Sequence, residues 1–117
     1  MTNKEILQGN KLVAEFMGYS FQKMSLRKYK TFMIKGYHDY NENWNALMLV
    51  VVKIESLGYC VCIFRGCCDI EERMNNQENW EEIASGGGQP KILSAYMSVI
   101  KFIKWYNAEI RNGQPIK

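Results

Sequence analysis

Apolar residues recur at helical spacing in three stretches of the chain. In the first, residues 3–17, apolar side chains fall near one side of a helix. Thr2 or Asn3 is suited to cap its start, and Gly18 stands where a residue with left-handed backbone usually ends a helix. Gly9 costs the helix interior about 1 kcal/mol relative to alanine. This helix is therefore predicted to depend on tertiary contacts.

The second stretch, residues 41–58, reads NENWNALMLVVVKIESLG. Its apolar residues recur every three or four positions, which favours a helix even though three consecutive valines favour a strand. Asn41 is suited to cap the start of this helix, Glu42 follows early in it, and Gly58 stands where the helix should end. Leu49, Val50 and Val52 widen the apolar stripe, so we expect this central helix to be covered on more than one side.

The third stretch, residues 91–110, is predicted to be a long helix with Pro90 in its first turn and Gly113 beyond its end. Phe102 and Trp105 lie off its continuous apolar seam. We interpret them as covering a neighbouring element, and a contact in a homodimer is the alternative hypothesis. The seam itself is formed by Ile92, Tyr96, Val99, Ile103, Tyr106 and Ile110.

Between the second and third helices, the pattern predicts a β-hairpin. Its strands are Tyr59–Phe64 and Cys67–Glu71, joined by Arg65 and Gly66 as a two-residue turn. Opposed residues of a hairpin share a face. One face would carry Val61, Ile63, Cys68 and Ile70, and the other Cys60, Cys62, Phe64, Cys67, Asp69 and Glu71. The first set is the predicted core face.

Two further segments after the hairpin are expected to be loops. Residues 72–82 are polar and acidic, and Trp80 within them is predicted to anchor the loop to the core. Residues 84–91, ASGGGQPK, form a glycine run that leads into the last helix. They match neither the Walker pattern nor the dinucleotide-binding fingerprint, although a helix start of this kind can bind an anion. The whole chain, residues 1–117, is then one α+β domain of helices packed on both sides of a small antiparallel sheet, an α/β/α sandwich.

All four cysteines lie within the hairpin, and three of them, Cys60, Cys62 and Cys67, share its second face with carboxylates. This keeps a metal site open as a hypothesis. The spacing, however, lacks the paired C-x-x-C knuckles of zinc sites, and the single histidine, His38, is distant in sequence. A catalytic thiol needs a lowered pKa and an organised base, and Arg65 is the one local residue that is a candidate to activate it. Packing is therefore the favoured interpretation, with no metal or cofactor predicted.

Composition and charge add only weak constraints. The 117 residues are 47% hydrophobic and 23% charged, with a formal net charge of +3, as in many globular proteins. The longest uncharged apolar run, Trp44–Val52, is too short to cross a bilayer, and the first residues do not lead into a signal-peptide core. We therefore expect a cytoplasmic protein with reduced thiols and no membrane partner.

A ligand site, if there is one, is predicted around the aromatic stretch GYHDYNENWN, residues 36–45. The candidate residues are Tyr37, His38, Tyr40 and Trp44, with Lys91 from the glycine run. His38 beside Asp39 suggests acid–base chemistry, but adjacent residues generally point apart and no nucleophile is tied to them by spacing. No catalytic residue is predicted.

Three blocks of the chain resemble a known family. KLVAEFMGY, YHDYNENWNALMLVVVKIESLGY and KILSAYMSVIKFIKWYN, in this order, are similar to small proteins of phages, prophages and Bacteroidetes in the phage ABA sandwich domain group. The family often has proline where this chain has Leu49 and an acidic residue where it has Val52. The resemblance implies α/β/α layering around a small antiparallel sheet, and it implies no established catalytic residues.

The leading functional hypothesis is a non-enzymatic accessory protein of a phage or mobile element that binds a protein or a small ligand, either as a monomer or as a homodimer. The alternative is nucleic-acid binding through the basic segment that contains Arg27, Lys28, Lys30 and Lys35. A small hydrolase or metal enzyme that uses His38, Asp39 or the cysteines is the third hypothesis, and the single histidine counts against it.

Overall fold

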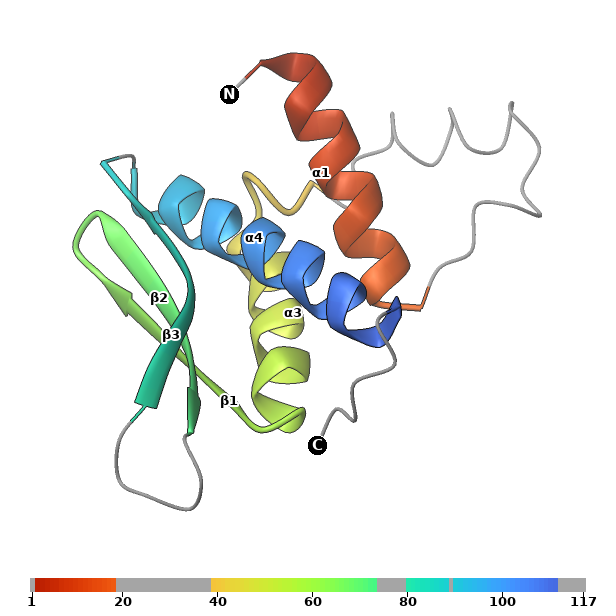
Figure 1. Cartoon of the computed structure of the whole chain (residues 1–117). Coiled ribbons are helices and arrows are strands. Elements are labelled where there is room, and N and C mark those ends of the chain that lie inside the picture. Colours follow the sequence, from red (N-terminus) through yellow and green to blue (C-terminus); the bar gives the residue numbers. More distant parts are fainter. Residues whose placement is uncertain (1, 19–38, 74–79, 89, 112–117) are drawn as a thin grey trace.

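A computed structural model describes residues 2–18, 39–73, 80–88 and 90–111 of the chain. These residues form helices and an antiparallel sheet with the strand order β1-β2-β3, so the predicted α+β class is confirmed (Figure 1). The elements are α1 (Asn3–Phe16), α3 (Trp44–Ser56), β1 (Tyr59–Phe64), β2 (Cys67–Arg73), β3 (Trp80–Gly87) and α4 (Lys91–Arg111).

The predicted capping is confirmed for α1, whereas α3 begins later than predicted, since its cap is Asn43 and not Asn41 and Glu42 lies before the helix. The Thr2 hydroxyl accepts a hydrogen bond from the Glu5 N–H at 3.2 Å and so caps α1. The Asn43 side-chain oxygen accepts one from the Ala46 N–H, also at 3.2 Å, and caps α3. The three valines of α3 are helical, because the spacing of its buried residues outweighs their preference for strands.

The hairpin has the predicted register. Phe64 pairs with Cys67 next to the turn, and Cys62 pairs with Asp69. Gly66 has a φ of 63°, which a two-residue hairpin turn requires and which glycine adopts without strain. The predicted core face is confirmed at its centre, since Cys68 and Ile70 are fully buried.

The third strand, β3, was not predicted. The expectation of loops was wrong at residues 72–73, which extend β2, and at residues 80–82 and 84–87, which belong to β3. The strand is antiparallel to β2, with a bulge that shifts the register between Ile70 and Glu71. Its second half contains alanine, serine and glycine, which lack the bulky side chains that mark strands in a sequence. The structure requires small residues there, because α4 packs directly on this part of the strand.

The described helices lie on one face of the sheet, whereas the sequence led us to expect helices on both faces. Figure 1 shows α3 and α4 beside the sheet, with α1 on the side of α4 away from it. The Tyr59 ring of β1 contacts Phe102 of α4 with ring centroids 4.8 Å apart, and a side chain at Gly86 of β3 would overlap the Ser94 carbonyl of α4. A single buried cluster therefore joins this face to all three helices. None of the described helices is both long and apolar enough to cross a membrane.

Helix α4 is buried on two sides because it lies between the sheet and α1. Phe102, off the predicted seam, is fully buried and packs on Phe16 of α1 as well as on Tyr59, which confirms that it covers neighbouring elements. On the other side, the Tyr96 hydroxyl donates a hydrogen bond to the Ile6 carbonyl of α1 at 3.1 Å. The Lys53 ammonium of α3 donates a hydrogen bond to the Phe16 carbonyl of α1 and so joins these two helices.

Helix α3 is buried on one side only within the described part of the chain. Leu47, Val50 and Ile54 are fully buried, whereas Leu49 is 64% exposed and Val52 61% exposed. We expected cover on more than one side from the width of the apolar stripe. The second side of that stripe instead faces solvent, because the sheet and the other described helices all lie toward the first side.

Candidate functional site

The structure describes three of the five residues predicted to bind a ligand, namely Tyr40, Trp44 and Lys91. Tyr37 and His38 lie outside the described residues. Tyr40 is only 3% exposed and belongs to the core, so its side chain is not open to a ligand. Trp44 and Lys91 are both exposed and line one hollow together with Ile63.

This hollow has a volume of about 390 Å³ and is open to solvent. Trp44 comes from the start of α3, Ile63 from β1, and Lys91 from the start of α4. Trp44 and Ile63 supply apolar surface, and the Lys91 ammonium supplies a positive charge at its edge. Since Trp44 and Lys91 are the first residues of their helices, the positive ends of two helix dipoles also lie at this place. The arrangement suits an apolar group that carries a carboxylate or another anion.

The hollow continues into an exposed apolar face of α3. Trp44, Leu49 and Val52 of this helix are exposed, whereas Met48 between them is partly buried and packs against the core. We call Trp44, Leu49 and Val52 the α3 outer face. Trp44 is 38% exposed, less than Leu49 and Val52, and it also lines the hollow. The sequence pattern marked Leu49 and Val52 as apolar but could not show that they face solvent.

The second face of the hairpin carries the thiols, as predicted. The sulfur atoms of Cys60 and Cys62 lie 3.6 Å apart and both residues are half-buried. The hydrogen bond with Cys60 raises the pKa of the Cys62 thiol to about 11, with burial as the second cause. A thiol with a raised pKa is a poor nucleophile at neutral pH. The described residues contain no group of three or more His, Cys, Asp or Glu side chains placed to hold a metal ion.

A polar contact lies under the aromatic stretch. The buried Asn10 of α1 donates a hydrogen bond through its side-chain NH₂ to the side-chain oxygen of Asn41 at 3.0 Å. The Asp39 backbone carbonyl accepts from the N–H groups of Glu42 and Asn43, both at 3.0 Å, and so closes the turn before α3. Asp39 therefore shapes the entry to α3, and its predicted neighbour in acid–base chemistry, His38, lies outside the described residues.

Comparison with known proteins adds no relative. No protein-family model, no curated protein and no solved structure matches this chain. The resemblance to the phage ABA sandwich domain group stays a prediction.

Proposed function

We propose that this chain is a non-enzymatic binding protein whose partner is another protein, held on the α3 outer face and in the hollow of Trp44, Ile63 and Lys91. The observation that supports the proposal is the exposure of large apolar side chains on α3 beside that hollow. Exposed tryptophan next to a positive charge is typical of the residues that dominate protein interfaces. The open shape of the hollow favours a protein surface over an enclosed small molecule.

The exposed area is large enough to contribute to binding. Complete burial of a leucine or valine side chain stabilises by about 1.5–3 kcal/mol. Leu49 and Val52 are each about three-fifths exposed, so covering both supplies roughly 2–4 kcal/mol. Burial of Trp44 adds to this. These contributions are sufficient for a hot spot, although they become affinity only after the cost of association is subtracted.

The charges around the hollow define the chemistry of the partner. Lys91 and the two helix starts favour a partner segment in which a carboxylate lies beside an apolar side chain. Glu42 is exposed and lies two residues before Trp44, so it opposes such a segment. Lys91→Glu should therefore weaken binding, and Glu42→Gln should strengthen it.

The test begins with affinity capture from a host lysate, followed by purification of the captured protein and measurement of its affinity by calorimetry. The double variant Leu49→Ser/Val52→Ser should lose at least tenfold in affinity. Its free energy of unfolding should change by less than about 0.5 kcal/mol per exposed site, which separates lost binding from lost folding. Lys4→Glu reverses an exposed charge on α1 and is the matched control for Lys91→Glu.

Each alternative has a distinct outcome. Light scattering that shows a dimer in the wild type and a monomer in the serine double variant would make the partner a second copy of this chain. Binding to oligonucleotides that weakens steeply with salt and is indifferent to the serine substitutions would replace the proposal with the nucleic-acid alternative, whose residues 27–35 lie outside the described residues. The role in a phage or mobile element is supported only by the resemblance of the three sequence blocks.

A further inference from the structure

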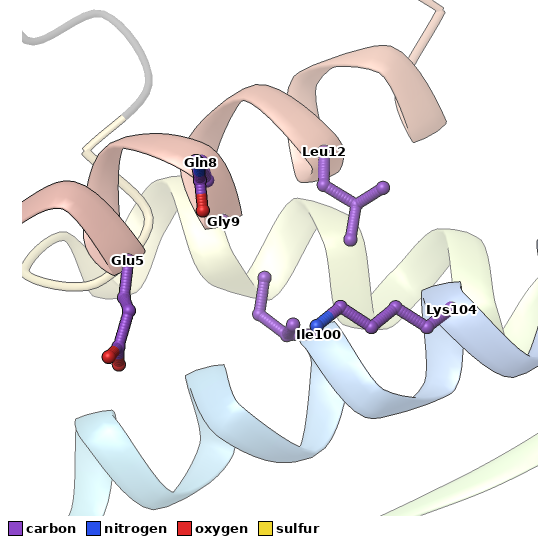
Figure 2. A pocket seen from close by; sticks show the side chains of 6 residues that line it. All are labelled: Glu5, Gln8, Gly9, Leu12, Ile100 and Lys104. Atoms are coloured by element: carbon purple, nitrogen blue, oxygen red, sulfur yellow. The ribbon is translucent and has the colours of Figure 1, made fainter.

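A second cavity, separate from the α3 outer face, lies between α1 and α4. Its volume is about 370 Å³, within the range of roughly 300–1,000 Å³ that small-ligand sites have. The lining residues are Glu5, Gln8, Gly9 and Leu12 of α1 with Ile100 and Lys104 of α4 (Figure 2).

The cavity has an apolar floor with opposite charges on the two sides of Ile100. Leu12 and Ile100 face the space between the helices, and Gly9 contributes no side chain to fill it. Figure 2 shows the Glu5 carboxylate on one side of Ile100 and the Lys104 ammonium on the other. Both side chains are exposed, and no described residue forms an ion pair with either of them.

We infer that this cavity binds a short peptide with free ends, with its amino group at Glu5, its carboxylate at Lys104 and an apolar side chain over Leu12 and Ile100. A negatively charged side chain attracts an ammonium group and a positively charged one attracts a carboxylate. A ligand that carries both, joined by an apolar body, satisfies all parts of the lining at once. This inference does not depend on the protein partner of the α3 outer face.

The length of the cavity indicates the length of the peptide. Glu5 and Leu12 are seven residues apart on α1, which corresponds to about 10 Å along a helix that rises 1.5 Å per residue. Because the Lys104 side chain reaches back to Ile100 (Figure 2), this distance is an upper limit for a peptide that joins the two charges. An extended peptide spans about 3.3–3.6 Å per residue, so about three residues cover that distance. A tripeptide with a central leucine, such as Ala-Leu-Ala, is therefore the appropriate probe.

The experiment is a titration of the whole ¹⁵N-labelled chain with Ala-Leu-Ala, with its N-acetylated form and with its C-amidated form. Amide signals of residues near Leu12 and Ile100 should shift on addition of the free tripeptide. Acetylation and amidation should each weaken binding about two- to fivefold, as expected for the loss of one exposed ion pair. Gln8→Trp fills the cavity with an indole ring and should weaken binding by more than tenfold.

The two charges are identified by pairing variants with blocked peptides. In Glu5→Gln the effect of acetylation should disappear while that of amidation remains, and in Lys104→Gln the reverse should hold. Glu15→Gln and Lys4→Gln remove exposed charges elsewhere on α1, so both blocking effects should persist in them. Absence of shifts at about 10 mM peptide, or an acetylation effect that is equal in the wild type and Glu5→Gln, would overturn the inference. These outcomes are independent of whether a protein binds the α3 outer face.

Discussion

Gly9 offers the sharpest test of how α1 is held. In an open helix interior, replacement of glycine by alanine stabilises by about 1 kcal/mol. Here a Cβ atom at Gly9 would overlap the Tyr96 hydroxyl and would lie 3.1 Å from Cδ1 of Ile100. Tyr96 is fully buried, and its hydroxyl donates the hydrogen bond to the Ile6 carbonyl. We therefore expect Gly9→Ala to destabilise the protein.

The magnitude follows from three contributions. Overpacking of a buried contact costs about 1–3 kcal/mol. Displacement of the Tyr96 hydroxyl from the Ile6 carbonyl leaves a buried polar group unsatisfied, which costs another 1–3 kcal/mol or so. The gain in helix propensity returns about 1 kcal/mol. The net loss is about 3 kcal/mol at the centre of these ranges, a large part of the stability of a domain of this size.

Urea unfolding monitored by circular dichroism measures the change, and a double-mutant cycle shows its origin. Tyr96→Phe alone should cost about 1 kcal/mol, the value of one hydrogen bond. The double variant Gly9→Ala/Tyr96→Phe should be less destabilised than the sum of the single variants by 1 kcal/mol or so, because the overlapping oxygen is absent. Gln8→Ala, at an exposed position on the same helix, is the control and should change stability by less than about 0.5 kcal/mol.

A Gly9→Ala variant as stable as the wild type, or more stable, would refute this reasoning. It would mean that α1 moves away from α4 without loss, and that Gly9 is a weak point of the helix with no packing role. Additive effects of the two substitutions would likewise show that the Tyr96 hydroxyl is not the group that excludes a side chain at this position.

Two further predictions concern the sheet. Gly86→Ala should lower the free energy of unfolding in urea by about 2–4 kcal/mol, because its Cβ would overlap the Ser94 carbonyl. Gly87→Ala is the control: its Cβ meets only ordinary contacts, so the free energy of unfolding should change by less than about 1 kcal/mol. Equal losses in the two variants would contradict the close approach of α4 to β3. The folded pKa of Cys62, about 11, exceeds that of an unfolded thiol, so its contribution to stability is present below pH 9 and lost as the pH rises through 11. Unfolding measured from pH 8 to 11 should show a smaller decline in Cys62→Ser than in the wild type, and identical declines would contradict the assignment.

Local patterns in the sequence were sufficient for the helices and the hairpin. A helix or a two-residue hairpin is specified by residues close together in the chain, through apolar spacing, capping side chains and turn glycines. For this reason the cap of α1 at Thr2, the helical state of the valines in α3 and the pairing of Cys62 with Asp69 could all be predicted. The turn at Gly66 alone determined which cysteines share a face.

The remaining features depend on contacts between distant segments. The strand β3 contains residues of weak strand preference, and it forms because it pairs with β2. The absence of a side chain at Gly86 also lets α4 pack closely on the strand. The sequence showed that α3 has apolar residues on two sides, but only the packing of the sheet and α4 decided that Leu49 and Val52 face outward. Nothing local related Trp44 to Lys91 either; they line one hollow because the starts of α3 and α4 meet at the same end of β1. The spacing of apolar residues determines whether a segment can form a helix or a strand. Which side of that helix or strand is buried depends on the other segments that pack against it.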